Sequence, residues 1–180
     1  MIKVKSLLSL GPTAEKGRIW NGVEKIFFES SSKKTFATPE EKEAFRFKYL
    51  DWYAKHHPDC FFIALENDSD ALGYICGVPD TRLHADLAKL HPWFTLFADC
   101  FESFPAHLHI NCGESSRGHG LGSTLLTVFE NHVKSQNAPG IHLVTSPEAR
   151  NVGFYDKNGY KFTKTGEWKG ASLLLMGKSL

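Results

Sequence analysis

The sequence predicts a mixed α/β fold, and three observations lead to this class. Strand-like and helix-like segments alternate along the 180 residues. Hydrophobic residues make up 42% of the chain and aromatic residues 13%, which is enough for a well-filled core. In the middle of the chain, a strand-like run leads through a glycine-rich stretch into a helix-like run. We therefore expect one domain over residues 1–180, in which strands and helices interleave.

The chain is predicted to begin with a strand over residues 2–8 and a helix over residues 15–28. The helix is indicated by apolar residues at helical spacing, namely Ile19, Val23, Ile26 and Phe27. Residues 30–37 form a polar linker.

A second helix is predicted to start at Thr38. Thr38 is a suitable N-cap, Pro39 suits the first turn, and Glu41 stands at the capping-box position. The residues expected on one face of this helix are Phe45, Tyr49, Trp52 and Tyr53.

Residues 60–67 and 71–78 are rich in strand-forming residues and are separated by a short polar turn, so they predict an antiparallel hairpin. Residues 81–105 show helical spacing that Pro92 and Pro105 interrupt, which indicates one or two short helices.

After a predicted strand over residues 106–112, a helix is expected over residues 122–136. Its expected inward residues are Leu121, Leu125, Val128, Phe129 and either His132 or Val133. A strand over residues 140–146 and a short helix that ends at Gly159 should follow. The last two segments, residues 161–168 and 171–180, can pair as a final hairpin.

Composition and charge exclude several function classes. The formal net charge is +1, so we expect no nucleic-acid partner and no anionic membrane partner. No apolar run approaches the ~20 residues of a membrane span, and the first residues lack a signal-peptide core. The four cysteines, Cys60, Cys76, Cys100 and Cys112, show no CxxC spacing. These features predict a reducing, cytoplasmic setting without a zinc site or a disulfide framework.

The most informative stretch is the glycine-rich segment before the predicted helix. Gly118, Gly120 and Gly122 alternate directly before a run of leucines, although glycine costs ~1 kcal/mol relative to alanine inside a helix. A glycine-rich turn at a helix N-terminus lets a phosphate approach backbone amides without meeting a Cβ atom. Arg117 adds a permanent cation. The stretch therefore predicts a pyrophosphate cradle.

Two common phosphate motifs do not fit this segment. No lysine follows the glycines, as a P-loop requires, and their spacing is not the GxGxxG of a dinucleotide fold. The pattern R-x-x-G-x-G, formed by Arg117, Gly120 and Gly122 after a strand, resembles the acetyl-coenzyme A (acetyl-CoA) loop of the GNAT superfamily of N-acyltransferases.

A second segment strengthens this resemblance. Residues 151–160 are similar to the family motif N-x-x-F-Y-E-K-x-G-F, with Asp156 and Tyr160 as mild replacements. The resemblance implies a GNAT fold with a central twisted mixed sheet of six or seven strands flanked by helices. It covers residues 1–42 only loosely, and residues 80–106 would be a family-variable helical insertion. The chain also resembles the acetyltransferase-like C-terminal domain of O-GlcNAc hydrolases and its free-standing bacterial relatives.

The resemblance implies roles for thirteen residues. Tyr155 would protonate the leaving thiolate, and Asn151 and Phe154 would flank the pantetheine arm of acetyl-CoA. The end of the strand would offer backbone groups to the thioester and this arm, and the glycine loop would hold the pyrophosphate. These backbone positions are Ile110, Asn111, Cys112, Arg117, Gly118, His119, Gly120, Leu121, Gly122 and Ser123.

The general base that deprotonates the amine is not marked by any motif. His109, Glu114 and Glu66 are the candidates, and the sequence leaves them open. His107 and His109 should share one strand face with His142 on a neighbouring strand, but polar surface is the more common role of such pairs. We therefore expect no metal. For Cys112, a small buried hydrophobe is the more common role than a nucleophile.

Three functions remain open at this point. The first is an N-acetyltransferase that uses acetyl-CoA as co-substrate and a small-molecule or peptide amine as acceptor, acting as a monomer or a homodimer. The second is a catalytically weak module that binds acetyl-CoA or CoA for regulation or interaction. The third is a different phosphate-binding protein with a similar loop.

Overall fold

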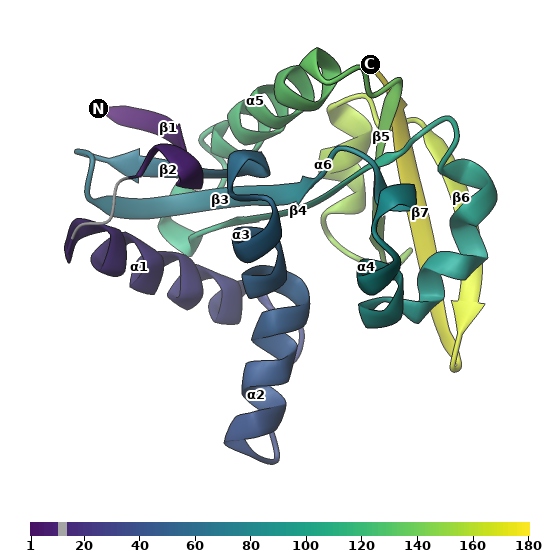
Figure 1. Ribbon diagram of the computed structural model, residues 1–180, viewed down its shortest axis with the longest axis horizontal. Helices are drawn as coiled ribbons and strands as arrows, with labels where there is room; N and C mark the ends of the chain where they lie inside the picture. Colours follow the sequence, from purple (N-terminus) through teal and green to yellow (C-terminus); the bar gives the residue numbers. More distant parts are fainter. Residues whose placement is uncertain (11–13) are drawn as a thin grey trace. The chain divides into compact units, whose positions relative to one another are not determined.

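The structure is a computed structural model that describes residues 1–10 and 14–180 (Figure 1). It contains a seven-stranded mixed sheet in the order β1-β2-β3-β4-β5-β7-β6, flanked by helices, which confirms the predicted mixed α/β class. The β4–β5 pair is parallel, whereas the β1–β2, β2–β3, β5–β7 and β6–β7 pairs are antiparallel.

The predicted strands and hairpins are all present. The strands are β1 Ile2–Ser6, β2 Phe61–Glu66, β3 Asp70–Val78, β4 Ala106–Cys112, β5 Gly140–Thr145, β6 Phe162–Trp168 and β7 Ala171–Ser179. The α-helices are α1 Ala14–Ser30, α2 Pro39–Arg46, α3 Trp52–His56, α4 Ala85–Leu90, α5 Leu121–Ser135 and α6 Val152–Lys157. Among the described residues, no helix is long and apolar enough to cross a membrane.

The chain divides into two compact units. The first comprises residues 1–77 and 109–131, and the second comprises residues 78–108 and 132–180. β4 and α5 each begin in one unit and end in the other. The single domain over residues 1–180 stays a prediction.

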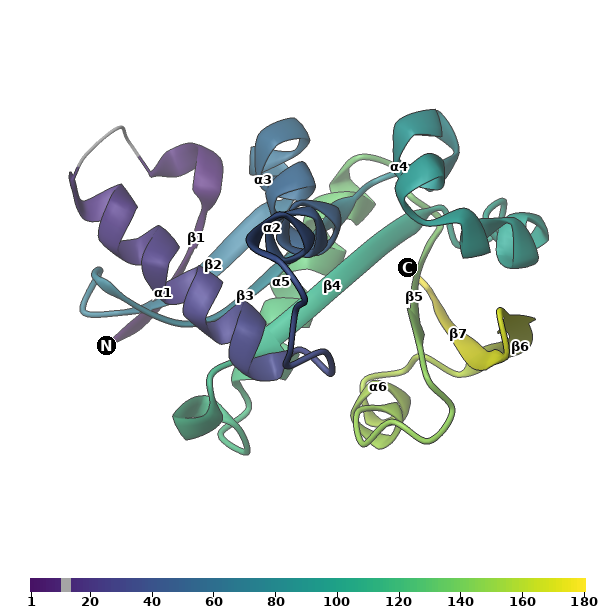
Figure 2. The ribbon, with the colours of Figure 1, turned by 90° about the horizontal axis from the view of Figure 1, so that it is seen from below.

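In the first unit, α1 and α5 cover opposite faces of the β2–β3 hairpin (Figures 1 and 2). The ring of Trp20 on α1 lies 5.8 Å from that of Phe61, and the ring of Phe129 on α5 lies 6.4 Å from that of Phe62. Because neighbouring residues of a strand point to opposite faces, these two contacts place the helices on different sides.

The apolar spacing of both helices is largely confirmed. The four predicted inward residues of α1 are at most 4% exposed. In α5, Leu126 is buried as well, whereas Val128 is only half-buried. Val133, rather than His132, is the fully buried residue of the last turn.

The helix that Thr38 caps is interrupted by a π-helical turn. The Thr38 hydroxyl accepts a hydrogen bond from the Glu41 amide at 3.2 Å, as the capping motif predicts. Five residues, Phe47–Asp51, then form the π turn between α2 and α3. Arg46 donates to Asp51 at 2.8 Å and to Glu24 at 2.9 Å beside this turn, and these bonds raise the pKa of Arg46. The π turn inserts one residue and shifts the helical phase, and Leu50 within it is fully buried although the α-helical spacing did not predict it on the inner face.

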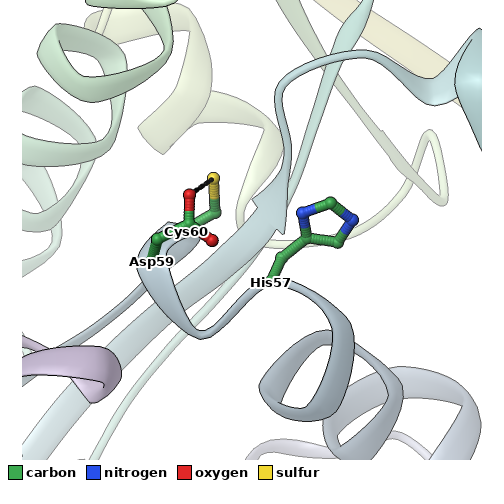
Figure 3. A group of neighbouring side chains, drawn as sticks. All are labelled: His57, Asp59 and Cys60. Atoms are coloured by element: carbon green, nitrogen blue, oxygen red, sulfur yellow. Dashed lines mark hydrogen bonds between the residues drawn. The ribbon is translucent and has the colours of Figure 1, made fainter.

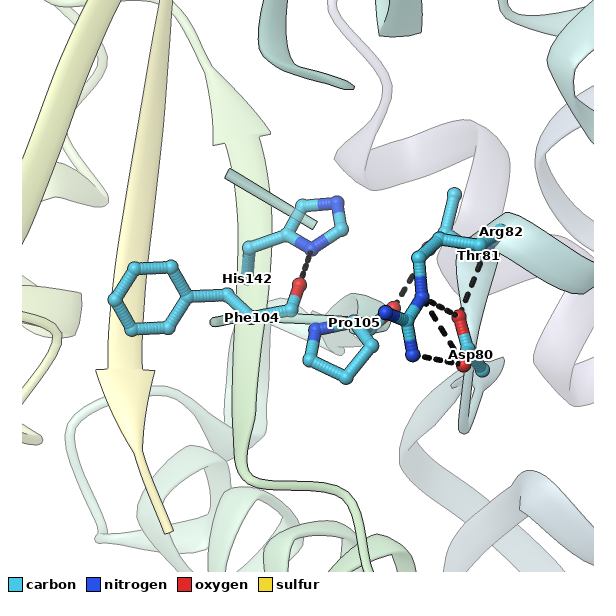
Figure 4. A network of polar contacts seen from close by, with 6 residues as sticks. All are labelled: Asp80, Thr81, Arg82, Phe104, Pro105 and His142. Carbon is cyan, nitrogen blue, oxygen red and sulfur yellow. Dashed lines mark hydrogen bonds and ion pairs between the residues drawn. The ribbon is translucent and has the colours of Figure 1, made fainter. Parts of the chain in front are cut away.

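In the second unit, residues 81–105 form the short helices η4 Thr81–Leu83 and η5 Pro92–Cys100 beside α4. With α4, the segment has three short helical pieces rather than the one or two expected, and η4 and η5 are 3₁₀. Hydrogen bonds between Thr81 and Pro105 join the two ends of this segment (Figure 4). The Pro105 carbonyl accepts hydrogen bonds from the Thr81 amide and hydroxyl, both at 2.9 Å.

The histidines of this unit correct another expectation. His107 is fully buried rather than part of a polar surface, and its ring centroid lies 5.0 Å from that of His142. His142 is also fully buried, and its Nδ1 lies 2.6 Å from the Phe104 carbonyl oxygen (Figure 4). Burial lowers the pKa of His142 to about 4, although the hydrogen bond to Phe104 opposes the shift. His142 is therefore a neutral core residue at pH 7.

Candidate functional site

The glycine-rich loop of the first unit has the backbone geometry of an open cradle. Gly118 has φ +81° and Gly120 has φ +80°, which is the left-handed region that favours glycine. A Cβ atom built on either residue would meet no protein atom within 4 Å. α5 begins at the next residue, Leu121, and the first amides of a helix have no acceptor within the helix. The loop thus combines open space with amides available to an anion.

Arg117 fixes the loop to the end of β4. Its Nε donates to the Cys112 carbonyl at 3.1 Å, and its Nη2 donates to the Ser30 hydroxyl at 3.3 Å. Arg117, the cation that the sequence predicts for the pyrophosphate site, therefore connects the loop to the end of β4 and to the end of α1. His119 is exposed and Ser123 is half-buried in the same segment.

The three predicted backbone positions at the end of β4 are half-buried. Asn111 donates from its side-chain amide to the Tyr74 hydroxyl at 2.8 Å, which anchors the strand end to β3. Burial raises the pKa of the Cys112 thiol, although Arg117 opposes the shift. A thiol held protonated is a poor nucleophile, so this shift supports a packing role for Cys112.

Of the three candidate bases, His109 has the best-defined surroundings. Its Nε2 lies 3.1 Å from the Tyr53 hydroxyl, and the Tyr49 ring meets the imidazole edge-on at a centroid distance of 5.8 Å. Burial raises the pKa of Tyr53 well above its usual value, so its hydroxyl stays neutral. Glu66 is exposed at the end of β2. Glu114 is exposed in the 3₁₀ turn Glu114–Ser116.

The second predicted motif lies in the second unit, on and before α6. Tyr155 is 5% exposed and packs against Tyr160, with ring centroids 5.8 Å apart. Asn151 accepts a hydrogen bond from the Thr145 hydroxyl at 3.0 Å, and Phe154 is half-buried. Gly159 has φ +92° just after the helix, as a C-terminal glycine should. The sequence pattern predicts a helix from Pro147, whereas α6 begins only at Val152.

The structure therefore brings together the predicted residues of the β4 end and the glycine loop within the first unit. Asn151, Phe154 and Tyr155 form a separate group in the second unit. The roles assigned to both groups stay predictions. Sequence reasoning missed Tyr53 and Tyr49 as neighbours of His109, because nothing in their spacing indicates a contact with a strand 56 residues away along the chain.

Within the part of the chain that the structure describes, one group of three side chains could hold a metal ion. His57, Asp59 and Cys60 place their ligand atoms within 4.8 Å of one another (Figure 3). The Cys60 thiol donates to the Asp59 carboxylate at 3.7 Å, and Cys60 is fully buried. The burial of Cys60 and its hydrogen bond to Asp59 give the Cys60 thiol a structural role that requires no metal ion.

Comparisons with known proteins agree with the overall fold. The model of the acetyltransferase (GNAT) family matches residues 20–160. Among solved structures, a protein named SsHAT is 20% identical, with 99% of this chain and 98% of that chain covered and a TM-score of 0.71. The NatC complex bound to Gag peptide and CoA is 13% identical, with 99% and 98% covered and a TM-score of 0.64. An N-acetyltransferase from Staphylococcus aureus Mu50 is 14% identical, with 99% and 98% covered and a TM-score of 0.61.

Proposed function

Since this chain belongs to the GNAT acetyltransferase family, we propose that it transfers an acetyl group from acetyl-CoA to an amine of an acceptor. The observation that carries the proposal is the open glycine loop at the start of α5, with its two left-handed glycines. The CoA bound in the related NatC structure supports the same cofactor here. A closer relation to the O-GlcNAc hydrolase domains stays a prediction.

The loop would hold the pyrophosphate of acetyl-CoA through backbone amides. Gly118 and Gly120 would leave room for the phosphate oxygens, and the first amides of α5, which have no acceptor within the helix, would donate to them. Acetyl-CoA supplies the activated acyl group. The residues of this chain bind it, orient it and move protons.

Proton transfer is the chemical task left to the side chains. The amine nitrogen attacks the thioester carbonyl, an oxyanion develops, the C–S bond breaks, and the amine loses a proton. We assign the acceptance of this proton to His109. The Tyr53 hydroxyl lies 3.1 Å from Nε2 of His109, so the two side chains form a polar contact at the half-buried part of β4. Tyr53 would then orient the ring and stabilise the imidazolium as it forms.

Tyr155 is proposed as the acid that protonates the departing thiolate. Replacing Tyr155 with phenylalanine keeps the buried ring and its packing against Tyr160 but removes the hydroxyl. We expect nearly unchanged acetyl-CoA affinity and a kcat ~10- to 10³-fold lower. This range lies below that of strong general acids, because a thiolate is already a fair leaving group. The defect should shrink at lower pH, where buffer can supply the proton. A kcat equal to that of the parent would remove Tyr155 from the mechanism.

The cofactor can be tested before any acceptor is known. Acetyl-CoA at a hundredfold excess over its Kd should stabilise the protein by ~2.7 kcal/mol and raise its Tm, whereas NAD and ATP should shift the Tm little. A larger shift with NAD would contradict the proposal.

Turnover can then be measured as thiol release over a panel of amino acids, polyamines, aminosugars and short peptides. Release with at least one amine is expected. If acetyl-CoA binds and no amine is acetylated, the chain is better described as a CoA-binding module. The proposal further includes a monomer or homodimer in the cytoplasm, a setting with which the four free cysteines agree.

A further inference from the structure

The turn between α3 and β2 brings together three side chains of different metal-ligand types. His57, Asp59 and Cys60 lie at the end of α3 and in the 3₁₀ helix η3 Pro58–Cys60, and their ligand atoms are within 4.8 Å of one another (Figure 3). All three belong to the first unit and are separate from the residues assigned to acetyl transfer. Imidazole nitrogen, carboxylate oxygen and thiolate sulfur are the ligand atoms that Zn²⁺ takes in proteins.

The backbone of this turn is held by hydrogen bonds and by the strand that follows. The His57 amide donates to the Tyr53 carbonyl at 2.8 Å, and the Cys60 amide donates to the His57 carbonyl at 3.0 Å. Pro58 restricts the backbone between these two bonds. β2 begins at Phe61, which is fully buried. The three side chains therefore extend from a turn that is already ordered, which lowers the cost of assembling a binding site.

The separation of Cys60 and Asp59 fits a shared zinc ion. In tetrahedral sites zinc lies about 2.3 Å from sulfur and about 2.0–2.2 Å from a carboxylate oxygen, which places two such ligands about 3.6 Å apart. The Cys60 sulfur lies 3.7 Å from the Asp59 oxygen. A proton on the sulfur now joins the two groups, and a zinc ion would take its place while the proton passes to solvent. The His57 ring would move closer through its χ angles, which a half-buried side chain permits.

The burial of the three side chains suits a site with one open position. Cys60 is fully buried, which distinguishes this group from an exposed acidic cluster, whereas His57 and Asp59 are half-buried. The two half-buried groups leave a route for the ion from solvent and room for a water molecule as fourth ligand. A buried thiolate is costly by itself, so the cation and the charge on sulfur would compensate each other.

We propose that His57, Asp59 and Cys60 form a zinc site with water in the fourth position. Mg²⁺ and Ca²⁺ prefer sets of oxygen ligands, so the thiolate and the imidazole select against them. The ion would connect the end of α3 to the start of β2 and stabilise the first unit. The lack of CxxC spacing does not exclude such a site, because one cysteine is enough where a histidine and an aspartate lie beside it.

A cobalt titration of the full chain, first freed of metal with a chelator, tests ligation by the thiol. Co²⁺ substitutes for Zn²⁺ in tetrahedral sites, and its thiolate complexes have a charge-transfer band in the near ultraviolet. We expect this band with one Co²⁺ per chain and its loss when Zn²⁺ is added, whereas Mg²⁺ and Ca²⁺ should leave it unchanged. Cys60→Ser should not produce the band. No band in the parent, or a band that persists in Cys60→Ser, would overturn the proposal.

His57→Gln tests the imidazole without a change in the buried core. Calorimetry should give a zinc affinity at least ~10-fold weaker than that of the parent, since even the second-shell partners of metal sites contribute about 10- to 100-fold. His56→Gln is the matched control, because His56 is the exposed neighbour at the end of α3 and lies outside the group. Its ring stacks on Trp52 at 4.9 Å. Equal zinc affinities of the two variants would place the ion on surface histidines and overturn the assignment.

Thermal unfolding provides a second readout that needs no change in the cysteine. Zinc should raise the Tm of the parent and of His56→Gln, and it should raise the Tm of His57→Gln less. A Tm of the parent that zinc leaves unchanged would contradict the proposal. The site does not depend on acetyl transfer, and these measurements use neither acetyl-CoA nor an amine, so the zinc site and the proposed function can fail separately.

Discussion

Replacing Gly120 with valine is expected to abolish acetyl-CoA binding while the protein stays folded. The space beyond Gly120 contains no protein atom within 4 Å, so the valine side chain would occupy only the volume in which we place the phosphates. The residue is exposed, and thus no core contact is lost. The backbone at φ +80° adds a strain of ~1–2 kcal/mol for a residue with a Cβ atom. Calorimetric titration with acetyl-CoA and a thermal unfolding curve measure the two effects.

Gly170→Val provides a closely matched control. Gly170 also has φ +80°, also has no atom within 4 Å of a built Cβ, and lies in the turn between β6 and β7. Its replacement should lower the Tm by a similar amount and leave acetyl-CoA affinity unchanged. If Gly120→Val binds acetyl-CoA as tightly as the parent, or if both variants lose binding equally, the loop is not the phosphate site.

These glycines could be identified from the sequence because their signal is local. The pattern marks three glycines as a special backbone segment, and Gly118 and Gly120 adopt the left-handed conformation, whereas Gly122 lies within α5. The Thr38 cap and the strands could also be predicted from the sequence. The residues that mark them, a capping motif and alternating apolar residues bounded by turns, lie next to one another in the chain. Local physics fixes such features, so one sequence is enough to predict them.

Features that depend on distant segments could not be predicted in this way. The burial of His107 follows from its pairing with His142 on β5, and the spacing of residues 106–112 does not reveal which strand is its neighbour. The contact of Tyr53 with His109 joins α3 to a strand residue 56 positions away along the chain. The three candidate bases were equivalent in the sequence because their difference lies in this tertiary contact.

The contact between Tyr53 and His109 leads to the second large expected effect. His109→Gln should lower kcat by ~10²–10⁴-fold, because the attacking amine would then lose its proton without a positioned base. Glutamine can still form a hydrogen bond with Tyr53, and His109 is only half-buried, so the Tm should change little. Acetyl-CoA affinity should be unchanged, since the amine is absent when the coenzyme binds. The measurements are initial rates of thiol release with a saturating amine from the panel, together with a calorimetric titration.

Two further variants, Glu114→Gln and Tyr53→Phe, test whether His109 rather than a neighbouring group is the general base. Glu114 is an exposed rival base in the 3₁₀ turn before the loop, and its replacement should leave kcat within about two-fold. Tyr53→Phe keeps the buried ring and removes only the hydroxyl that contacts Nε2, so it should lower kcat less than His109→Gln does. A large loss in Glu114→Gln with normal turnover in His109→Gln would transfer the role of base to Glu114.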